Sequence, residues 1–207
     1  MINILFVCIT AILSYLIGSI NTSIIYSKLR EDDIRNHGSK NAGATNTLRT
    51  YGKKACAIVV IGDALKGIVA ILLSMGLFKI LNIDGSFYNI GKYTAAFCAV
   101  LGHNFPVFFG FRGGKGILTS VTSIFLLDYR CALIIFVVGI LLIAIFKMVS
   151  LGSCAGALIF PFCAYYINGD MYFVIFAVLA SVLSLIRHKD NIKRILNGTE
   201  SKIGQKK

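Results

Sequence analysis

Long apolar runs separated by short polar segments decide what this chain can fold into. Hydrophobic residues make up 57% of its 207 residues and charged residues only 14%, whereas soluble domains carry about 25% charged residues. An apolar helix of about 20 residues is long enough to cross a bilayer. We therefore expect an all-α fold, a polytopic membrane helical bundle that forms a single domain over residues 1–207.

The apolar runs predict seven transmembrane helices. The run 117–147 would measure about 46 Å as one straight helix, more than the hydrocarbon thickness of about 30 Å, so we divide it at Asp128–Arg130. The first run has no basic flank and no cleavage motif, and we expect it to be retained rather than removed as a signal peptide. The predicted spans are 2–27, 55–78, 91–110, 117–127, 131–147, 154–167 and 171–186.

The basic residues are distributed unevenly along the chain. Of the 21 Lys and Arg residues, 17 lie in the segments 28–54, 111–116 and 147–153 and in the tail from residue 187. Segments rich in Lys and Arg tend to stay in the cytoplasm. The odd number of spans places the two termini on opposite sides of the membrane. The distribution of Lys and Arg then predicts an N-terminus outside the cell and a cytoplasmic C-terminus.

The formal net charge of +12 favours anionic partners. Because the cations lie between apolar runs and beside glycines, we expect anionic lipid and phosphorylated substrates rather than nucleic acid. The polar segments on the predicted cytoplasmic side are rich in Arg, Lys, Ser and Asn and poor in acids, a composition that suits a phosphate-bearing ligand.

Two of these segments have the composition of anion-binding loops. His37–Arg49 is small, polar and glycine-bearing; glycines let backbone N–H groups turn toward a ligand, and arginine offers a fixed fork of donors. Arg112–Gly116 places two cations and three glycines before a predicted helix, whose N-terminus attracts phosphate. It lacks the Walker A spacing. The alternatives are a solvated loop for the first segment and a basic membrane-edge anchor for the second.

Asp63 and Lys66 are ionisable residues inside a predicted span. Their i, i+3 spacing puts them on one helical face, and such residues in a membrane face a polar interior or each other. Two interpretations stay open, an ion pair that holds helices together and a wall of a substrate cavity.

No pattern in the sequence indicates a metal site. The six cysteines lie in or beside apolar runs without a C-x-x-C motif, so we expect small hydrophobic side chains and no disulfide. No carboxylate cluster suggests Mg²⁺, and no His/Cys spacing suggests zinc.

The polar stretches follow one another in the order of a known set of signatures. Ser39–Arg49 fits S-G-N-x-G-A-T-N-x-x-R, apart from Lys40, which stands where glycine is usual. From about Gly18 to Lys202 the chain resembles the bacterial acyl-phosphate:glycerol-3-phosphate acyltransferases. The other stretches that carry this resemblance are Asp63-x-x-Lys66-Gly67, Gly102–Phe108 with Gly113–Gly116, Ser150–Ser153, and Arg187–Arg194 with Gly198 and Glu200.

The resemblance implies an enzyme of the bacterial inner (plasma) membrane with its active site on the cytoplasmic side. It implies transfer of a fatty acyl group from acyl phosphate to the 1-hydroxyl of sn-glycerol 3-phosphate, giving lysophosphatidate and phosphate, the first step of phospholipid synthesis. The implied partners are these two substrates and membrane lipid, without cofactor, metal or coenzyme A. The resemblance does not imply an oligomeric state, which stays unknown from the sequence, and a monomer is compatible with it.

Motif position also implies the site residues. We expect a catalytic set of Ser39, Arg49, Lys115, His188 and Asn191, which together with Ser150 binds glycerol 3-phosphate. We expect Asn41, Gly43, Thr45, Asn46, Gly113, Gly114 and Gly116 to bind acyl phosphate, and Asp63, Lys66, His103 and Asn104 to support the site.

The histidines differ in their claim to the site. His37 is expected to be a hydrogen-bonding loop residue, and for His103 a structural and a chemical role both stay open. His188 shares a signature with Asn191, and we expect it to position a substrate rather than act as a general base.

Two other classes of protein also use a basic, polar membrane site. A transporter or channel for an organophosphate would need polar residues that continue to the outer face, and the outer halves of these spans have almost none. A lipid-surface or nucleic-acid scaffold would carry its charges on exposed runs rather than beside glycines. Both alternatives are less consistent with the sequence than acyl transfer.

Overall fold

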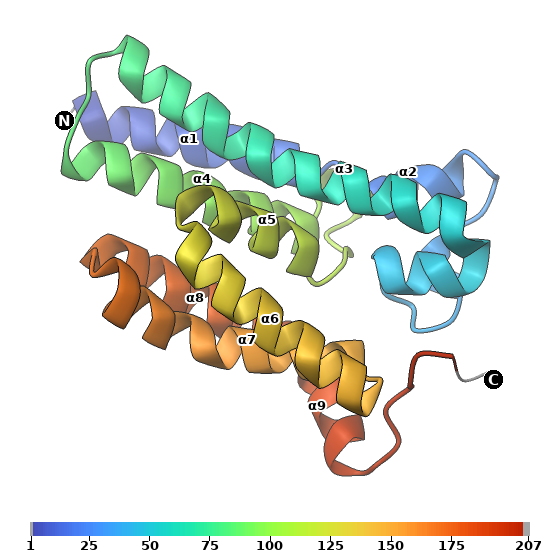
Figure 1. The fold of residues 1–207 in the computed structure, drawn as a ribbon. Coiled ribbons are helices and arrows are strands. Elements are labelled where there is room, and N and C mark those ends of the chain that lie inside the picture. Colours follow the sequence, from blue (N-terminus) through green and yellow to red (C-terminus); the bar gives the residue numbers. More distant parts are fainter. Residues whose placement is uncertain (1, 205–207) are drawn as a thin grey trace. The chain divides into compact units, whose positions relative to one another are not determined.

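The chain is built from helices. The computed structural model describes residues 2–204 and contains no strand in that part of the chain. It divides into two compact units, Met1–Ser123 and Ile124–Lys207, here called the first and the second unit (Figure 1). The predicted all-α class is confirmed, and the single domain over 1–207 stays a prediction.

In the first unit, two glycines allow close contact between α1 and α4. A Cβ on Gly18 would overlap the Ala99 carbonyl, and one on Gly102 would overlap the Tyr15 carbonyl. Small residues at such crossings let helix backbones approach closely in membranes, and α3 packs against both helices. The helices are α1 (Ile2–Gly18), α2 (Thr22–Lys28), η1 (Ile34–Asn36), α3 (Ala44–Ile80), α4 (Ser86–Asn104) and η2 (Val107–Phe109); α5 (Ile117–Leu127) begins here and ends in the second unit.

In the second unit, α6 packs on α7 and α7 packs on α8. Phe160, Phe173 and Phe176 form its aromatic core, with ring centroids 5.6–5.9 Å apart. Asp128 accepts hydrogen bonds at the start of α6 and a 2.8 Å bond from Asn168, which ties α6 to the α7–α8 connection. The helices are α6 (Tyr129–Phe146), α7 (Val149–Cys163), the π-helical turn η3 (Ala164–Asn168), α8 (Met171–Arg187) and α9 (Lys189–Leu196).

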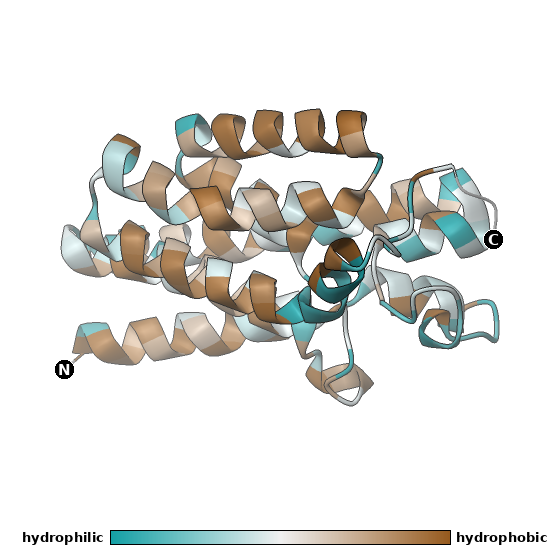
Figure 2. Ribbon diagram, turned by 90° about the horizontal axis from the view of Figure 1, so that it is seen from below, coloured by the Kyte–Doolittle hydropathy of each residue, from teal (hydrophilic) through white to brown (hydrophobic). Residues whose placement is uncertain are grey.

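The structure contains helices suited to a bilayer. Within residues 2–204, four are long and apolar enough to cross a membrane, or five if α8 and α9, bent by 63°, count as one span. Figure 2 shows apolar residues along the helices and hydrophilic ones mostly at helix ends and connections. A helix lies at each of the seven predicted places, while the count of seven spans and their orientation stay predictions. The four spans are Ile2–Lys28, Ala44–Ile80, Tyr129–Phe146 and Val149–Asn168.

Several predicted boundaries are wrong. The expected span 91–110 ends at Asn104 instead, because Pro106 has no N–H and disfavours a helical residue before it. The expected loop His37–Arg49 becomes helical from Ala44. The expected connector 147–153 is helical from Val149.

A sharp bend divides α3 at Gly52. Its backbone has φ 82° and ψ −172° in the middle of the helical run, a conformation found almost only in glycine. The bend separates the polar first turns, which carry Arg49, from the apolar part that follows. One glycine therefore sets the direction in which the polar turns leave the membrane-spanning part of α3.

We predict that Gly52→Ala destabilises the protein by roughly 1–3 kcal/mol, because alanine cannot adopt this backbone without strain. A Cβ at Gly52 would meet no atom within 4 Å, so the cost is one of conformation and not of packing. Gly76→Ala is the matched control, since Gly76 lies in the same helix, also has open space and has no positive φ. Thermal unfolding in detergent measures both, and equal midpoints for the two variants would contradict the prediction.

Candidate active site

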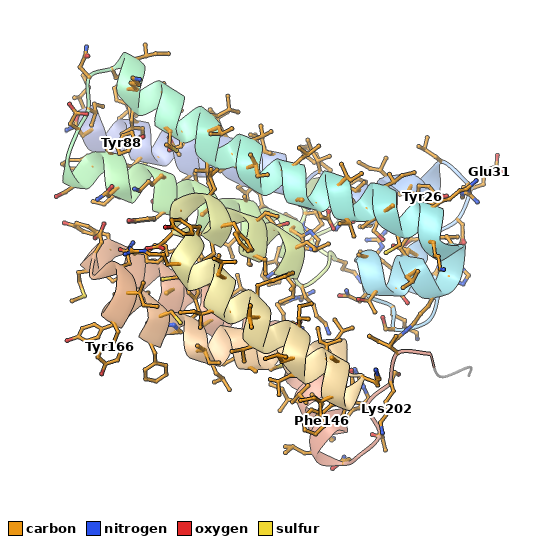
Figure 3. The ribbon with its side chains drawn as sticks, viewed as in Figure 1. Tyr26, Glu31, Tyr88, Phe146, Tyr166 and Lys202 are labelled. Atoms are coloured by element: carbon orange, nitrogen blue, oxygen red, sulfur yellow. The ribbon has the colours of Figure 1, made fainter. Side chains whose placement is uncertain are left out.

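In each unit the candidate residues lie toward one end. Figure 3 shows Tyr26 and Glu31 at one end of the first unit and Tyr88 at the other; in the second unit it shows Phe146 and Lys202 at one end and Tyr166 at the other. The 37–49 segment begins six residues after Glu31, and Ser150 lies four residues after Phe146, in the first turn of α7. The opposite ends, marked by Tyr88 and Tyr166, hold no predicted site residue.

Asn46 organises the 37–49 segment. Its side-chain amide donates to the carbonyls of Ile34, at 3.1 Å, and His37, at 3.0 Å, and accepts from the Ser39 N–H at 2.9 Å. It is 1% exposed. Because both amide donors are used, Asn46 shapes the loop in this conformation instead of offering its N–H groups to the acyl phosphate.

Buried polar residues of α2, which the sequence analysis did not single out, hold the same segment. Asn21 caps α2 and donates to the Ala42 carbonyl at 3.4 Å. Ser27 accepts from the Ile34 N–H at 3.1 Å, and Ser23 shares a 2.8 Å hydrogen bond with Thr47. The signal for them was the polar end of the first apolar run, Gly18–Ser23.

Asp32 joins the segment to α3. The Tyr51 hydroxyl donates to one of its oxygens at 2.6 Å, and His37 Nε2 lies 2.8 Å from the other. The hydrogen bond from Tyr51, followed by that from His37, lowers the pKa of Asp32 to about 2. The prediction that His37 is a hydrogen-bonding loop residue is confirmed.

The side chains of Ser39, Lys40 and Arg49 are exposed. Lys40 has φ 57°, in the left-handed region that glycine adopts without strain. This conformation explains why glycine suits the position. The lysine adds an exposed cation one residue after Ser39.

The remaining candidates of this segment surround the start of α3. Gly43 is the N-cap, and its carbonyl accepts from the N–H groups of Asn46 and Thr47 and from the Thr47 hydroxyl. Asn41 and Thr45 flank it and are partly exposed. Of the residues expected to bind acyl phosphate here, these two offer polar side chains at the surface.

The glycines of the 113–116 loop pack against the end of α4. The Gly113 N–H donates to the Asn104 carbonyl at 3.2 Å, and the Gly114 N–H donates to the His103 carbonyl at 3.1 Å. A Cβ on Gly114 would overlap His103 Nε2. These two N–H groups are directed at α4, so in this conformation the two glycines serve close packing.

The first turn of α5 offers a different place for an anion. Lys115 and Gly116 precede it, and the N–H groups of a first helical turn favour phosphate. Asn104 is fully buried next to Gly116, and neither atom of its amide has a hydrogen-bond partner. We call Asn104, Lys115, Gly116 and this first turn the α5 cradle.

A buried charge cluster lies beside the cradle. Lys66 Nζ is 2.9 Å from Asp63 Oδ1 and 2.7 Å from His103 Nδ1, and all three side chains are buried. Of the two interpretations left open for Asp63 and Lys66, the ion pair is present in the structure. His103 joins it, so the pair links α3 to α4.

In the second unit, Glu200 gathers the candidate residues. It accepts from the Ser150 hydroxyl at 2.7 Å, the Asn191 amide at 2.6 Å and the Arg194 guanidinium at 2.7 Å. His188 is 2% exposed, and its Nδ1 donates to the Ser184 carbonyl at 2.8 Å. Glu200 belongs to the C-terminal signature, but the sequence did not predict that its carboxylate would accept hydrogen bonds from Ser150, Asn191 and Arg194.

The structure thus brings the candidates together in two groups, one in each unit. The 37–49 segment, the end of α4 and the α5 cradle form the first group, and Ser150, His188 and Asn191 form the second. No group of three or more His, Cys, Asp or Glu residues within 2–204 is placed to hold a metal ion. The six cysteines are free thiols.

We predict that Glu200→Gln lowers stability at neutral pH by about 2 kcal/mol, the scale of a hydrogen bond to a charged group. Burial alone would raise the pKa of Glu200, but the bonds from Ser150, Asn191 and Arg194 outweigh it and lower the pKa from 4.5. This stabilisation is present above the unfolded-state pKa and is lost as the pH falls through the lower folded-state pKa.

Thermal unfolding from pH 7 to well below pH 4.5 tests this prediction, because the difference in midpoint between the wild type and Glu200→Gln should persist down to about the unfolded-state pKa of 4.5 and narrow only below it. Asp84→Asn, which changes an exposed carboxylate, is the control and should leave the profile unchanged. A gap that stays constant with pH would contradict the assignment.

The comparisons with known proteins agree with this geometry. The family model described as glycerol-3-phosphate acyltransferase matches residues 8–198. A glycerol-3-phosphate acyltransferase of Thermoanaerobacter sp. (strain X514) is 45% identical over 204 residues, covering 98% of each chain. One of Clostridioides difficile (strain 630) is 42% identical over 200 residues, covering 96% of each.

A solved structure has the same fold. The crystal structure of PlsY (YgiH), an integral membrane glycerol 3-phosphate acyltransferase, in its glycerol 3-phosphate form superposes with a TM-score of 0.84 at 33% identity and covers 96% of each chain. The extent of these matches confirms the resemblance found in the sequence motifs. This chain therefore belongs to the glycerol-3-phosphate acyltransferase family, multi-pass bacterial membrane enzymes of phospholipid synthesis.

Proposed function

We propose that this chain transfers a fatty acyl group from acyl phosphate to the 1-hydroxyl of sn-glycerol 3-phosphate, giving lysophosphatidate and inorganic phosphate in the first step of phospholipid synthesis. Family membership supports the acceptor. Related PlsY crystals are glycerol 3-phosphate and lysophosphatidic acid forms, the latter with a TM-score of 0.81 at 32% identity. The observation that carries the proposal is the α5 cradle, where a cation, a helix N-terminus and an unpartnered buried amide suit a phosphate group.

Each unit carries its own candidates for binding glycerol 3-phosphate. In the first unit, Arg49 and Lys115 supply positive charge and Ser39 supplies a hydroxyl group. In the second unit, Glu200 orients Ser150 and Asn191, an arrangement suited to holding glycerol or phosphate oxygens. We assign these residues and His188 to glycerol 3-phosphate by motif position.

The acyl phosphate is assigned to the segments that carry glycine and small polar side chains. Asn41 and Thr45 offer exposed polar groups beside Gly43, and Gly116 leads into the first turn of α5. Asn46, Gly113 and Gly114 contribute by shaping these segments, since their N–H groups bond within the protein. We assign Asp63, Lys66, His103 and Asn104 a supporting role, since they are buried and His103 and Asn104 contact the glycines of the 113–116 loop.

The chemistry follows from the substrates. The 1-hydroxyl oxygen attacks the acyl carbonyl carbon, the bond from that carbon to the phosphate oxygen breaks, and the departing phosphate takes the hydroxyl proton. Both substrates and the leaving group are anions, so cations that offset their repulsion and hold them in line supply much of the rate. Acyl phosphate is already an activated mixed anhydride, and the proposal needs no metal, no coenzyme A and no acyl-enzyme.

We also propose seven spans in the bacterial inner membrane, with the N-terminus outside and the active site and C-terminus in the cytoplasm. The excess of Lys and Arg in 28–54 and in the tail from 187 supports this orientation. A cysteine introduced at Gly85 of an otherwise cysteine-free protein should react with a membrane-impermeant reagent in intact cells. One introduced at Lys40 should react only after lysis, and the reverse pattern would contradict the orientation.

The central test is turnover by the purified protein in detergent. With acyl phosphate and glycerol 3-phosphate it should release phosphate and form lysophosphatidate, whereas acyl-CoA should not replace the acyl phosphate. Comparable turnover with acyl-CoA would exclude the proposed donor. Labelled acyl phosphate without acceptor should leave the protein unmodified, and a stoichiometric acyl-serine at Ser39 would exclude direct transfer.

We predict that Lys115→Ala lowers kcat/KM more than tenfold, a loss above about 1.4 kcal/mol, because a charge-assisted contact contributes roughly 1.5–3 kcal/mol. Arg49→Lys should also lose activity, since a point charge does not reproduce the guanidinium fork. Lys53→Ala removes an exposed cation of α3 outside the signatures and is the control. If Lys115→Ala is no worse than Lys53→Ala, Lys115 does not belong to the site.

A further inference from the structure

We infer that Asp63, Lys66 and His103 are positioning residues. Asp63 and Lys66 orient the His103 ring so that its Nε2 lies against Gly114, and the ring thereby fixes the backbone position of the neighbouring Lys115. The inference rests on the proposed function in taking Lys115 to contact a phosphate group. The cluster lies wholly in the first unit, among buried residues of α3 and α4. It gives a role in the reaction to an ion pair that would otherwise only link helices.

The hydrogen bonds of Lys66 determine which ring nitrogen of His103 carries the proton. The Lys66 ammonium group has three donors and no acceptor, and three acceptors surround it. These are the Ile20 carbonyl at 3.3 Å, Asp63 Oδ1 at 2.9 Å and His103 Nδ1 at 2.7 Å. With Lys66 as the ammonium ion, Nδ1 accepts its hydrogen bond, and the neutral imidazole ring then carries its proton on Nε2. Asp63 Oδ1 lies 3.6 Å from Nδ1, beyond hydrogen-bond distance.

His103 Nε2 lies against Gly114. A Cβ on Gly114 would overlap His103 Nε2 on one side. On the other side the same Cβ would lie only 2.5 Å from the Ala42 carbonyl oxygen. Only glycine fits between the ring and this carbonyl. The Gly114 backbone is thus held where the 37–43 segment, the α4 terminus and the cradle meet, one residue before Lys115.

The C-terminal end of the loop 105–116 is also fixed to α3. The Thr119 hydroxyl in the first turn of α5 donates to the Asp63 carbonyl at 2.9 Å, and Thr119 is fully buried. The loop from Phe105 to Gly116 therefore has both ends fixed to the same turn of α3, through His103 before it and Thr119 after it. A shift of this turn would be passed to Lys115 from both sides.

Two substitutions of His103 separate positioning from simple stabilisation. The amide of glutamine reaches about the place of Nε2, whereas the amide of asparagine reaches about the place of Nδ1. A purely structural role, in which His103 only satisfies Lys66, would favour His103→Asn. The inference favours His103→Gln, because its N–H can replace Nε2–H beneath Gly114.

We expect His103→Gln to keep kcat/KM for glycerol 3-phosphate within about threefold of wild type, and His103→Asn to lose at least about tenfold. The thermal midpoint of His103→Asn should stay close to wild type, because its amide oxygen can still accept from Lys66, whereas that of His103→Gln should fall, because Lys66 loses this acceptor. Equal kcat/KM for the two variants, or a loss in His103→Asn that follows its loss of stability, would overturn the inference.

Thr119 provides an independent test that leaves the charges untouched. Thr119→Val removes the bond to Asp63 and should raise the KM for glycerol 3-phosphate at least about fivefold, whereas Thr119→Ser keeps the hydroxyl and should stay near wild type. Thr122→Val is the matched control, since its hydroxyl bonds to the Ala64 carbonyl and to its own helix. If Thr119→Val and Thr122→Val behave alike, the inference is wrong.

The wild-type assay keeps the two proposals apart. Wild-type protein that does not turn over acyl phosphate and glycerol 3-phosphate would refute the proposed function. An active wild type whose His103 and Thr119 variants do not separate as described would refute only the positioning role.

Discussion

The arrangement of the first unit depends on satisfying one buried ammonium group. Lys66 is 5% exposed, and a charge in so apolar an environment is costly unless it is paired and fully hydrogen-bonded. Its three acceptors come from the break between α1 and α2, from α3 and from α4. Three segments distant in sequence must therefore converge on one point. The glycine-rich loop that carries Lys115 begins at that point, so the requirement to satisfy a charge also fixes the start of the loop in which we propose a phosphate contact.

The same principle builds the rest of the candidate site on a smaller scale. Asn46 satisfies three backbone groups of the 37–49 segment, and Glu200 satisfies three side chains in the second unit. In each case one polar side chain at the edge of an apolar bundle replaces the water that a loop would otherwise bind. Such loops are specified by a few hydrogen bonds instead of by an apolar core. This explains how short, irregular segments can be held firmly enough to orient reacting groups.

The sequence predicted the class of fold, a helix at each of seven places and the bounds of α5 at 117–127. It also predicted the pair Asp63–Lys66, because spacing on one helix is a local property. It missed the helical start of α3 at Ala44 and of α7 at Val149, since polar residues there have partners that only the tertiary structure supplies. It assigned Gly113 and Gly114 to a ligand, whereas their N–H groups bond to the end of α4. The partners of His103 and Glu200 depend on contacts 37 and 50 residues away along the chain, which no local pattern encodes.

The placement of Asp63 and Lys66 on one helix has a consequence for biogenesis. Because α3 precedes α4 in the chain, insertion of α3 ahead of α4 would take Lys66 out of water before His103 is in place to accept its hydrogen bond. A lone charge at mid-membrane opposes insertion, but an acid and a base one turn apart neutralise each other within the nascent segment. The apolar part of the helix, 55–78, can then partition into lipid with no net charge and with a local dipole. When α4 packs against α3, the His103 ring replaces water as the hydrogen-bond partner of Lys66. Completion of the polar cluster is therefore coupled to the packing of α4.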